Sequence, residues 1–144
     1  MLGSALRRLM ATLALLWLAR RQPGTDAHQL GRRSETLAAF FLRRQGYRIV
    51  ARNVRCGHDE LDLVAVRGWE LVFVEVKSSR SLQRDLSHAV DEPKAARLRR
   101  AAKAFMRTHA LSDPRIQMRF DLITVRWPTV SAEPAKICHY RDIV

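Results

Sequence analysis

The pattern of hydrophobic and polar positions divides the chain into alternating helical and extended segments. Helical spacing of apolar residues runs from about Ser34 to Gln45, with Gly46 as the stop, and from the predicted N-cap Asp91 to about Met106 or His109. Strands are predicted where Val, Leu and Phe cluster, at Tyr47–Asn53, Leu61–Val66, Leu71–Val76 and Met118–Trp127, with Lys136–Tyr140 as a candidate edge strand. This order is typical of a single α/β domain whose mixed β-sheet is flanked by helices.

Residues 1–29 are expected to form a basic amphipathic extension and linker ahead of a domain that spans residues 30–144. The apolar run Leu9–Ala19 is about half of the ~20 residues that a membrane-spanning helix needs. The arginines that follow it do not fit a signal peptide. One helical face collects large apolar side chains, namely Leu6, Leu9, Met10, Leu13 and Trp17. The extension either docks on the domain, docks on a membrane surface, or is mobile, and residues 22–26 form a linker.

The chain is strongly basic, and this charge favours certain classes of binding partner. It has 26 Lys and Arg against 14 Asp and Glu, a formal net charge of +12. Such a field attracts polyanions, nucleic acid first and anionic membranes second, although a solvated basic surface is the plain alternative.

Two cysteines, Cys56 and Cys138, lie far apart and form no disulfide framework, which predicts a reducing cytoplasm. Together with His58 and His139 they offer zinc ligands, but neither pair has the spacing of a zinc module. Packing and surface roles are the favoured interpretation.

The most informative segment joins two strands around Gly68-Trp69. A hairpin centred there places Asp62 opposite Glu75, and Glu60 opposite Lys77. Facing residues have Cβ atoms roughly 4.5–5.5 Å apart, so four charged side chains gather at the end of two otherwise apolar strands.

The like-charged pair predicts a divalent cation, because facing carboxylates repel each other and suit Mg²⁺ or Mn²⁺. Lys77 is close enough to orient or help deprotonate an attacking water and to stabilise charge on a phosphoryl oxygen. The pattern therefore predicts phosphodiester hydrolysis. A surface hairpin with an ordinary Glu–Lys pair is the alternative, but the apolar neighbours Val64 and Phe73 argue against it.

The segments Glu60–Val64 and Leu71–Lys77 resemble the signature of the YraN-like family of uncharacterised bacterial proteins. Further matching residues are Gly31, Glu35, Gly46-Tyr47, Arg52-Asn53, Lys94 and Arg119-Phe120-Asp121, so the resemblance covers about Gly31 to Val125. That family is a member of the restriction-endonuclease-like superfamily, whose site is written PD-(D/E)xK. The resemblance therefore implies a restriction-endonuclease-like fold.

The resemblance also implies a site. Asp62 and Glu75 would hold the metal ion with the carbonyl of Val76, Lys77 would be the catalytic lysine, and Glu35 would supply a further carboxylate. The chain departs from the family pattern at Asp59, which replaces a glycine, and at Ser78-Ser79-Arg80, which replaces a Thr-Arg pair. Neither departure removes a central catalytic group.

Five basic residues are the candidates for contacting a phosphate chain: Lys94, Arg97, Arg100, Lys103 and Arg52. The expected partner is nucleic acid, DNA in the first place, although nothing in the sequence separates DNA from RNA. No motif for reading bases is present.

Three hypotheses stay open. The first is a Mg²⁺- or Mn²⁺-dependent endonuclease, and the second is a nucleic-acid-binding module that cleaves little or nothing. The third is a basic protein that binds a membrane surface through residues 1–21. The intact set Asp62, Glu75 and Lys77 favours the first, because a pure binder gains nothing from carboxylates that repel phosphate.

Overall fold

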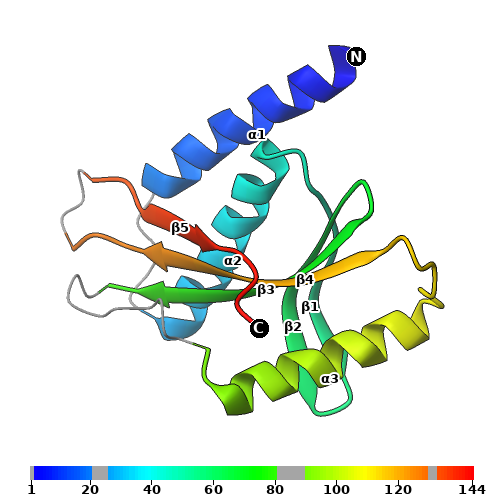
Figure 1. Ribbon diagram of the computed structural model, residues 1–144. Helices are drawn as coiled ribbons and strands as arrows, with labels where there is room; N and C mark the ends of the chain where they lie inside the picture. The colour runs from blue at the N-terminus through cyan, green and yellow to red at the C-terminus, as the bar shows by residue number, and fades with distance from the viewer. Residues whose placement is uncertain (1, 21–25, 81–89, 130–132) are drawn as a thin grey trace.

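Five strands form one mixed sheet in the order β1-β2-β3-β4-β5 (Figure 1). The computed structural model describes residues 2–20, 26–80, 90–129 and 133–144; the predicted linker falls outside them, except for Asp26. The elements are α1 (Leu2–Arg20), α2 (Ala27–Arg44), β1 (Arg48–Cys56), β2 (Asp59–Arg67), β3 (Glu70–Ser79), α3 (Glu92–Thr108), β4 (Gln117–Arg126) and β5 (Lys136–Tyr140).

Helices cover both faces of the sheet. Strands β3 and β4 are parallel and are joined through α3, whereas the other neighbouring strands are antiparallel. One core cluster lies between the sheet and α1 and α2, and includes Leu37, Val72 and Trp127. A second lies between the sheet and α3, and includes Phe73 and Phe105. The predicted α/β class with a mixed, helix-flanked sheet is confirmed, and the arrangement is consistent with a restriction-endonuclease-like fold.

The two helices that flank the sheet begin at aspartate caps. Asp91 accepts a hydrogen bond from the backbone N–H of Lys94, as the sequence predicted for the start of α3. Helix α2 begins at Ala27 behind Asp26, and the predicted start at Ser34 was too late. The first turns of α2 are polar, so hydrophobic periodicity missed them. Gly46, with φ of 91°, ends α2 as predicted.

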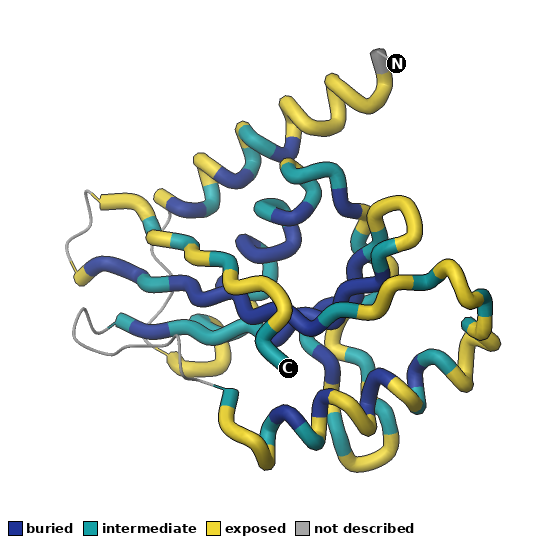
Figure 2. Tube along the Cα trace, viewed as in Figure 1, coloured by how far each residue is buried: buried dark blue, intermediate teal, exposed yellow. Residues whose placement is uncertain are grey.

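Helix α1 packs on α2, so docking on the domain is the alternative that the structure shows, and the contact is made by a face other than the predicted apolar one. Ala11, Leu15 and Ala19 are buried against the domain, and the N–H of Ala135 donates to the carbonyl of Ala19. The apolar stripe from Leu6 to Trp17 faces outward, along the exposed side of α1 in Figure 2. Small alanine side chains let α1 approach α2 closely, whereas the bulkier face does not fit there. In the part of the chain that the structure describes, no helix is long and apolar enough to cross a membrane.

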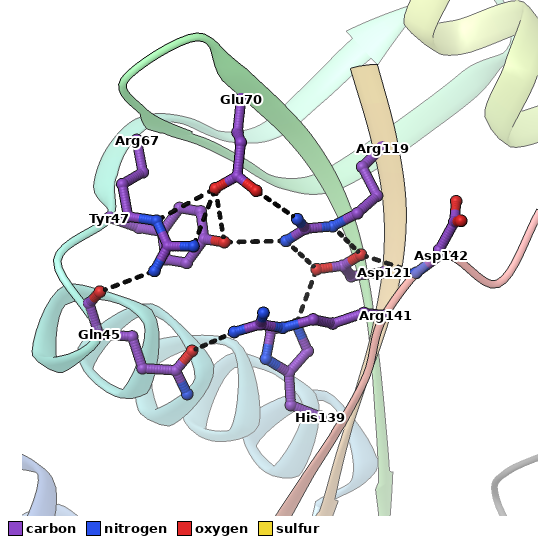
Figure 3. A network of polar contacts seen from close by, with 9 residues as sticks. All are labelled: Gln45, Tyr47, Arg67, Glu70, Arg119, Asp121, His139, Arg141 and Asp142. Carbon is purple, nitrogen blue, oxygen red and sulfur yellow. Dashed lines mark hydrogen bonds and ion pairs between the residues drawn. The ribbon is translucent and has the colours of Figure 1, made fainter. Parts of the chain in front are cut away.

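A buried polar network connects residues of β3, β4 and β5 with Tyr47, which precedes β1 (Figure 3). Asp121 on β4 is fully buried; it accepts two hydrogen bonds from Arg119, at 2.8 and 2.9 Å, and its Oδ2 lies 2.7 Å from Nε2 of His139. Arg119 also donates to Glu70 on β3 and to the hydroxyl of Tyr47. Burial alone would raise the pKa of Asp121, but hydrogen bonds from His139 and Arg119 outweigh it and hold the pKa below its usual range. The network is structural because its donors and acceptors satisfy one another.

Candidate metal and phosphodiester site

The β2–β3 hairpin has the predicted register from its turn as far as Leu63 and Val74, but the predicted pairing of Asp62 with Glu75 is not part of the ladder. Val66 pairs with Leu71 and Val64 with Phe73, around a turn at Gly68. The described ladder ends at Leu63 and Val74. Beyond that point β2 continues to pair with β1 as far as Asp59, while β3 continues beside β4 as far as Ser79. The two strands therefore separate at the end that carries the charged residues.

Asp62 lies where the two strands separate. Its Oδ2 accepts a hydrogen bond of 2.8 Å from the backbone N–H of Val76, in place of a ladder partner. In a strand, the N–H and C=O of one residue point to the same side. The carbonyl of Val76 therefore also faces the space between β2 and β3, as a carbonyl ligand to a cation would.

A pocket of about 390 Å³ opens at this separation, and we call it the carboxylate pocket. It gathers residues from α2, the β1–β2 turn, β2, β3 and α3, in agreement with the predicted convergence of Asp62, Glu75 and Lys77. Its lining residues are Glu35, His58, Asp59, Glu60, Asp62, Glu75, Val76, Lys77, Lys94, Arg97 and Leu98. Negative and positive side chains thus face one small volume.

Glu75 is the most deeply buried charged group of the pocket. Its side chain is only 2% exposed, and its Oε1 lies 3.0 Å from Nζ of Lys77 and 2.9 Å from Nζ of Lys94. Among the described residues, nothing donates to its Oε2, which is itself buried. A buried acceptor without a donor is costly, so this oxygen is suited to a ligand that the protein does not itself supply.

The carboxylate of Asp62 is largely buried and lies close to other negative charges. Burial raises its pKa most, and the nearby Glu75 carboxylate raises it further, to about 7, although the Val76 N–H opposes the shift. The charge of Glu35 acts in the same direction as that of Glu75. A carboxylate with so high a pKa is stabilised either by a proton or by a cation.

The pKa of Asp62 is raised and that of Asp121 is lowered, so replacing each by asparagine should have opposite effects on stability. Wild-type stability should fall as the pH rises from 3.8 to about 7, because the folded state there keeps a proton that the unfolded state loses. Asp62→Asn should therefore raise the free energy of unfolding by about 1–3 kcal/mol at pH 8 without metal, after allowance for solvent screening, and leave it unchanged below about pH 4.

Asp121→Asn is the control, because it removes a fully buried carboxylate that is paired with Arg119 and His139. It should lower the free energy of unfolding by about 3–5 kcal/mol at neutral pH. Chemical denaturation of both variants at pH 4 and pH 8 measures the two effects. A loss of stability in Asp62→Asn at pH 8 would show that Asp62 has a structural role.

Glu35 points into the carboxylate pocket, as predicted, from a half-buried position on α2. Asn53 donates to its Oε2 at 3.0 Å, and Asn53 has φ of 48°, a conformation that asparagine tolerates better than most residues. Nowhere in the described ranges do three His, Cys, Asp or Glu side chains already form a metal-ligand set. Glu35 therefore borders the pocket without completing such a set.

The predicted phosphate-contacting residues divide into two groups. Lys94 and Arg97 line the pocket, and Arg100 reaches its rim by pairing with Asp59 at 3.2 Å. Arg52 donates to the hydroxyl of Thr36 on α2, and Lys103 is exposed farther along α3; neither lines the pocket. Asp59, one of the two departures from the family pattern, thus holds the side chain of Arg100 at the pocket.

The alternative zinc site is wrong. Cys56 and His58 lie at the β1–β2 turn, whereas Cys138 and His139 lie on β5, at the opposite edge of the sheet. His58 instead lines the carboxylate pocket. The one sequence feature that indicates this position of His58 is the preceding Gly57, which has φ of 68° in the β1–β2 turn.

Comparison with known sequences places this site in a family. The model of "Uncharacterised protein family UPF0102" matches residues 34–125. The chain belongs to family UPF0102. A UPF0102 protein of Paenarthrobacter aurescens is 48% identical over 99 residues, which cover 67% of this chain and 78% of the relative. Relatives from Bacteroides thetaiotaomicron (46% over 101 residues, 69% and 81%) and Rhodopirellula baltica (39% over 117 residues, 79% and 69%) carry the same family name.

The UPF0102 match confirms the YraN-like resemblance. It contains every residue that lines the carboxylate pocket and also Arg119 and Asp121, whereas His139 and α1 lie outside it. The names of the family and of these relatives state no reaction, so a function is inferred from the geometry of the pocket.

Proposed function

We propose that this UPF0102 protein is a metal-dependent nuclease that hydrolyses phosphodiester bonds in the carboxylate pocket. One observation carries the proposal: the buried carboxylate of Glu75 has an unsatisfied oxygen, and it lies in one pocket with Asp62 and Lys77. Acidic groups gathered against their mutual repulsion are typical of functional sites.

The donor set fits a hard divalent cation. Carboxylate oxygens of Asp62 and Glu75 and the carbonyl of Val76 are the ligands that Mg²⁺ and Mn²⁺ prefer, and Glu35 borders the same volume. When bound, such a cation supplies positive charge to a phosphoryl oxygen and lowers the pKa of water. It would also relieve the repulsion that raises the pKa of Asp62.

The lysines supply the remaining chemistry. Lys77 is 39% exposed and reaches from the buried Glu75 toward solvent, where its ammonium group can orient a water or donate to a phosphoryl oxygen. Lys94 lies in the first turn of α3 and is more enclosed, with 23% exposure. Both are cations beside the point where a phosphodiester would react, so they favour the charge that develops there.

The surroundings suit a polyanionic substrate. The chain carries a net charge of +12, and Arg97 and Arg100 stand at or beside the pocket. We assign nucleic acid as substrate, DNA first, and cleavage within the chain as the reaction. We also propose a cytoplasmic location, because the free cysteines Cys56 and Cys138 suit a reducing compartment.

The direct test is incubation of the purified protein with duplex, branched and single-stranded DNA and RNA, in Mg²⁺, Mn²⁺ or EDTA. We expect cleavage of at least one substrate with either metal and none in EDTA. Inactivity on every substrate, together with no measurable binding of either metal, would overturn the nuclease assignment.

A binding module is the second candidate, and one observation favours it. Lys77 and Lys94 already neutralise one oxygen of Glu75 without a cation. A carboxylate neutralised in this way can be kept in the fold without chemistry. Tight binding in EDTA with no cleavage in metal would establish this candidate.

Substitution of Arg97 and Arg100 by alanine should weaken binding to all nucleic-acid sequences alike. Two lost phosphate contacts should flatten the slope of log K against log salt by about 2. Titration at several salt concentrations in EDTA measures this, with Arg99→Ala/Arg107→Ala as a control of equal charge on the same helix. An unchanged slope would show that phosphate binds elsewhere.

A further inference from the structure

The outer face of α1 carries six of the ten large apolar side chains that are exposed in the described part of the chain. Six large side chains on it are between 45% and 60% exposed: Leu6, Leu9, Met10, Leu13, Leu16 and Trp17. They recur every three or four residues, so they form one continuous stripe. The opposite face of the helix is already buried on α2, whereas the stripe lies on the solvent-exposed side of α1.

The charges around this stripe are all positive. Helix α1 contains no acidic residue, and Arg7, Arg8 and Arg20 accompany the apolar side chains. Beside the stripe lies a groove of about 830 Å³ between α1, α2 and β1, whose lining includes Arg7, Arg8, Arg43 and Arg48 and no carboxylate. The partner of this surface must therefore be apolar and anionic at once.

The groove and the stripe form one surface. Leu6 and Met10 belong to both, so the apolar side chains adjoin the four guanidinium groups directly. Arginine binds phosphate oxygens in a fork geometry, and a tryptophan such as Trp17 suits the boundary between headgroups and acyl chains. An anionic phospholipid presents a phosphate and an acyl chain in this same arrangement.

We propose that α1 and its basic groove dock the protein on the surface of an anionic lipid bilayer. The apolar stripe lies in the headgroup region, and Arg7, Arg8, Arg43 and Arg48 bind lipid phosphates. A second copy of the chain fits less well, because paired α1 helices would bring arginines together with no carboxylate on either helix to neutralise them.

Docking in this orientation leaves the carboxylate pocket accessible. Helix α3, which carries Lys94 and Arg97, covers the opposite face of the sheet from α1 (Figure 1). The proposal does not rest on the nuclease assignment, since it uses none of the pocket residues. A failure of one leaves the other standing.

Flotation with lipid vesicles tests the apolar stripe. The full-length protein should float with vesicles that contain phosphatidylglycerol and not with vesicles of phosphatidylcholine alone. Leu9→Gln/Leu13→Gln should lower the bound fraction at least tenfold at unchanged melting temperature, because both side chains are exposed. The control Val50→Gln/Met118→Gln, which alters exposed apolar residues on the sheet, should bind like wild type.

A charge pair tests the groove. Arg7→Gln/Arg8→Gln should lower binding about tenfold, and Arg55→Gln/Arg107→Gln, an equal loss of charge elsewhere on the surface, should lower it far less. The proposal is overturned if wild type does not bind anionic vesicles, or if both charge pairs lose binding equally. It is also overturned if light scattering shows a dimer that Leu9→Gln/Leu13→Gln dissociates, since a second copy then covers the stripe.

Discussion

Glu75→Gln and Asp62→Asn are each expected to lower metal-dependent cleavage by about 10²–10³-fold or more. Each substitution keeps the side-chain shape but removes a formal charge that the cation needs. Glu75 is 2% exposed, and Asp62 lies in the same pocket. Glu92→Gln, on the exposed side of α3, is the matched control and should cleave like wild type. Initial rates with Mg²⁺ and Mn²⁺ measure the effect.

The same variants separate chemistry from substrate binding. In EDTA their affinity for nucleic acid should persist or rise, because one charge that repels phosphate has gone. Cleavage at the wild-type rate in either variant would remove Asp62 and Glu75 from the mechanism. Loss of affinity together with a lower melting temperature would indicate a structural role for these carboxylates.

Lys77→Ala is expected to lower turnover by about 10²–10³-fold while metal affinity largely survives. Lys77 donates to Glu75 at 3.0 Å, but Lys94 contacts the same oxygen at 2.9 Å and keeps that carboxylate neutralised when Lys77 is removed. Metal binding by calorimetry and single-turnover cleavage measure the two properties separately. A parallel fall of metal affinity and turnover would mean that Lys77 only organises the ligands.

Sequence reasoning located the pocket because two strict rules determine it. A two-residue turn at Gly68-Trp69 sets the register, and alternation along each strand then directs Asp62 and Glu75 into the same pocket. The separation of β2 from β3 after Leu63 was not predictable in this way. It accompanies a tertiary hydrogen bond, in which the Asp62 side chain accepts the Val76 N–H. Hydrophobic periodicity does not predict such a bond.

Contacts between distant segments were predictable only in part. Lys94 was expected to bind phosphate, but its pairing with Glu75 depends on where α3 returns beside β3. Arg119 and Asp121 were noticed as part of the family resemblance, yet their structural role depends on His139, 18 residues away. On α1, which is apolar on several sides, hydrophobic spacing found the helix but not the face that packs.

A crystal soaked in Mn²⁺ tests the central claim most directly, because anomalous scattering locates the ion without reference to activity. We predict one anomalous peak in the carboxylate pocket, between the carboxylates of Asp62 and Glu75 and beside the carbonyl of Val76, with Lys77 and Lys94 displaced from Glu75. The account is contradicted if saturating Mn²⁺ leaves the pocket without a peak and both lysines still paired to Glu75 at 3.0 and 2.9 Å.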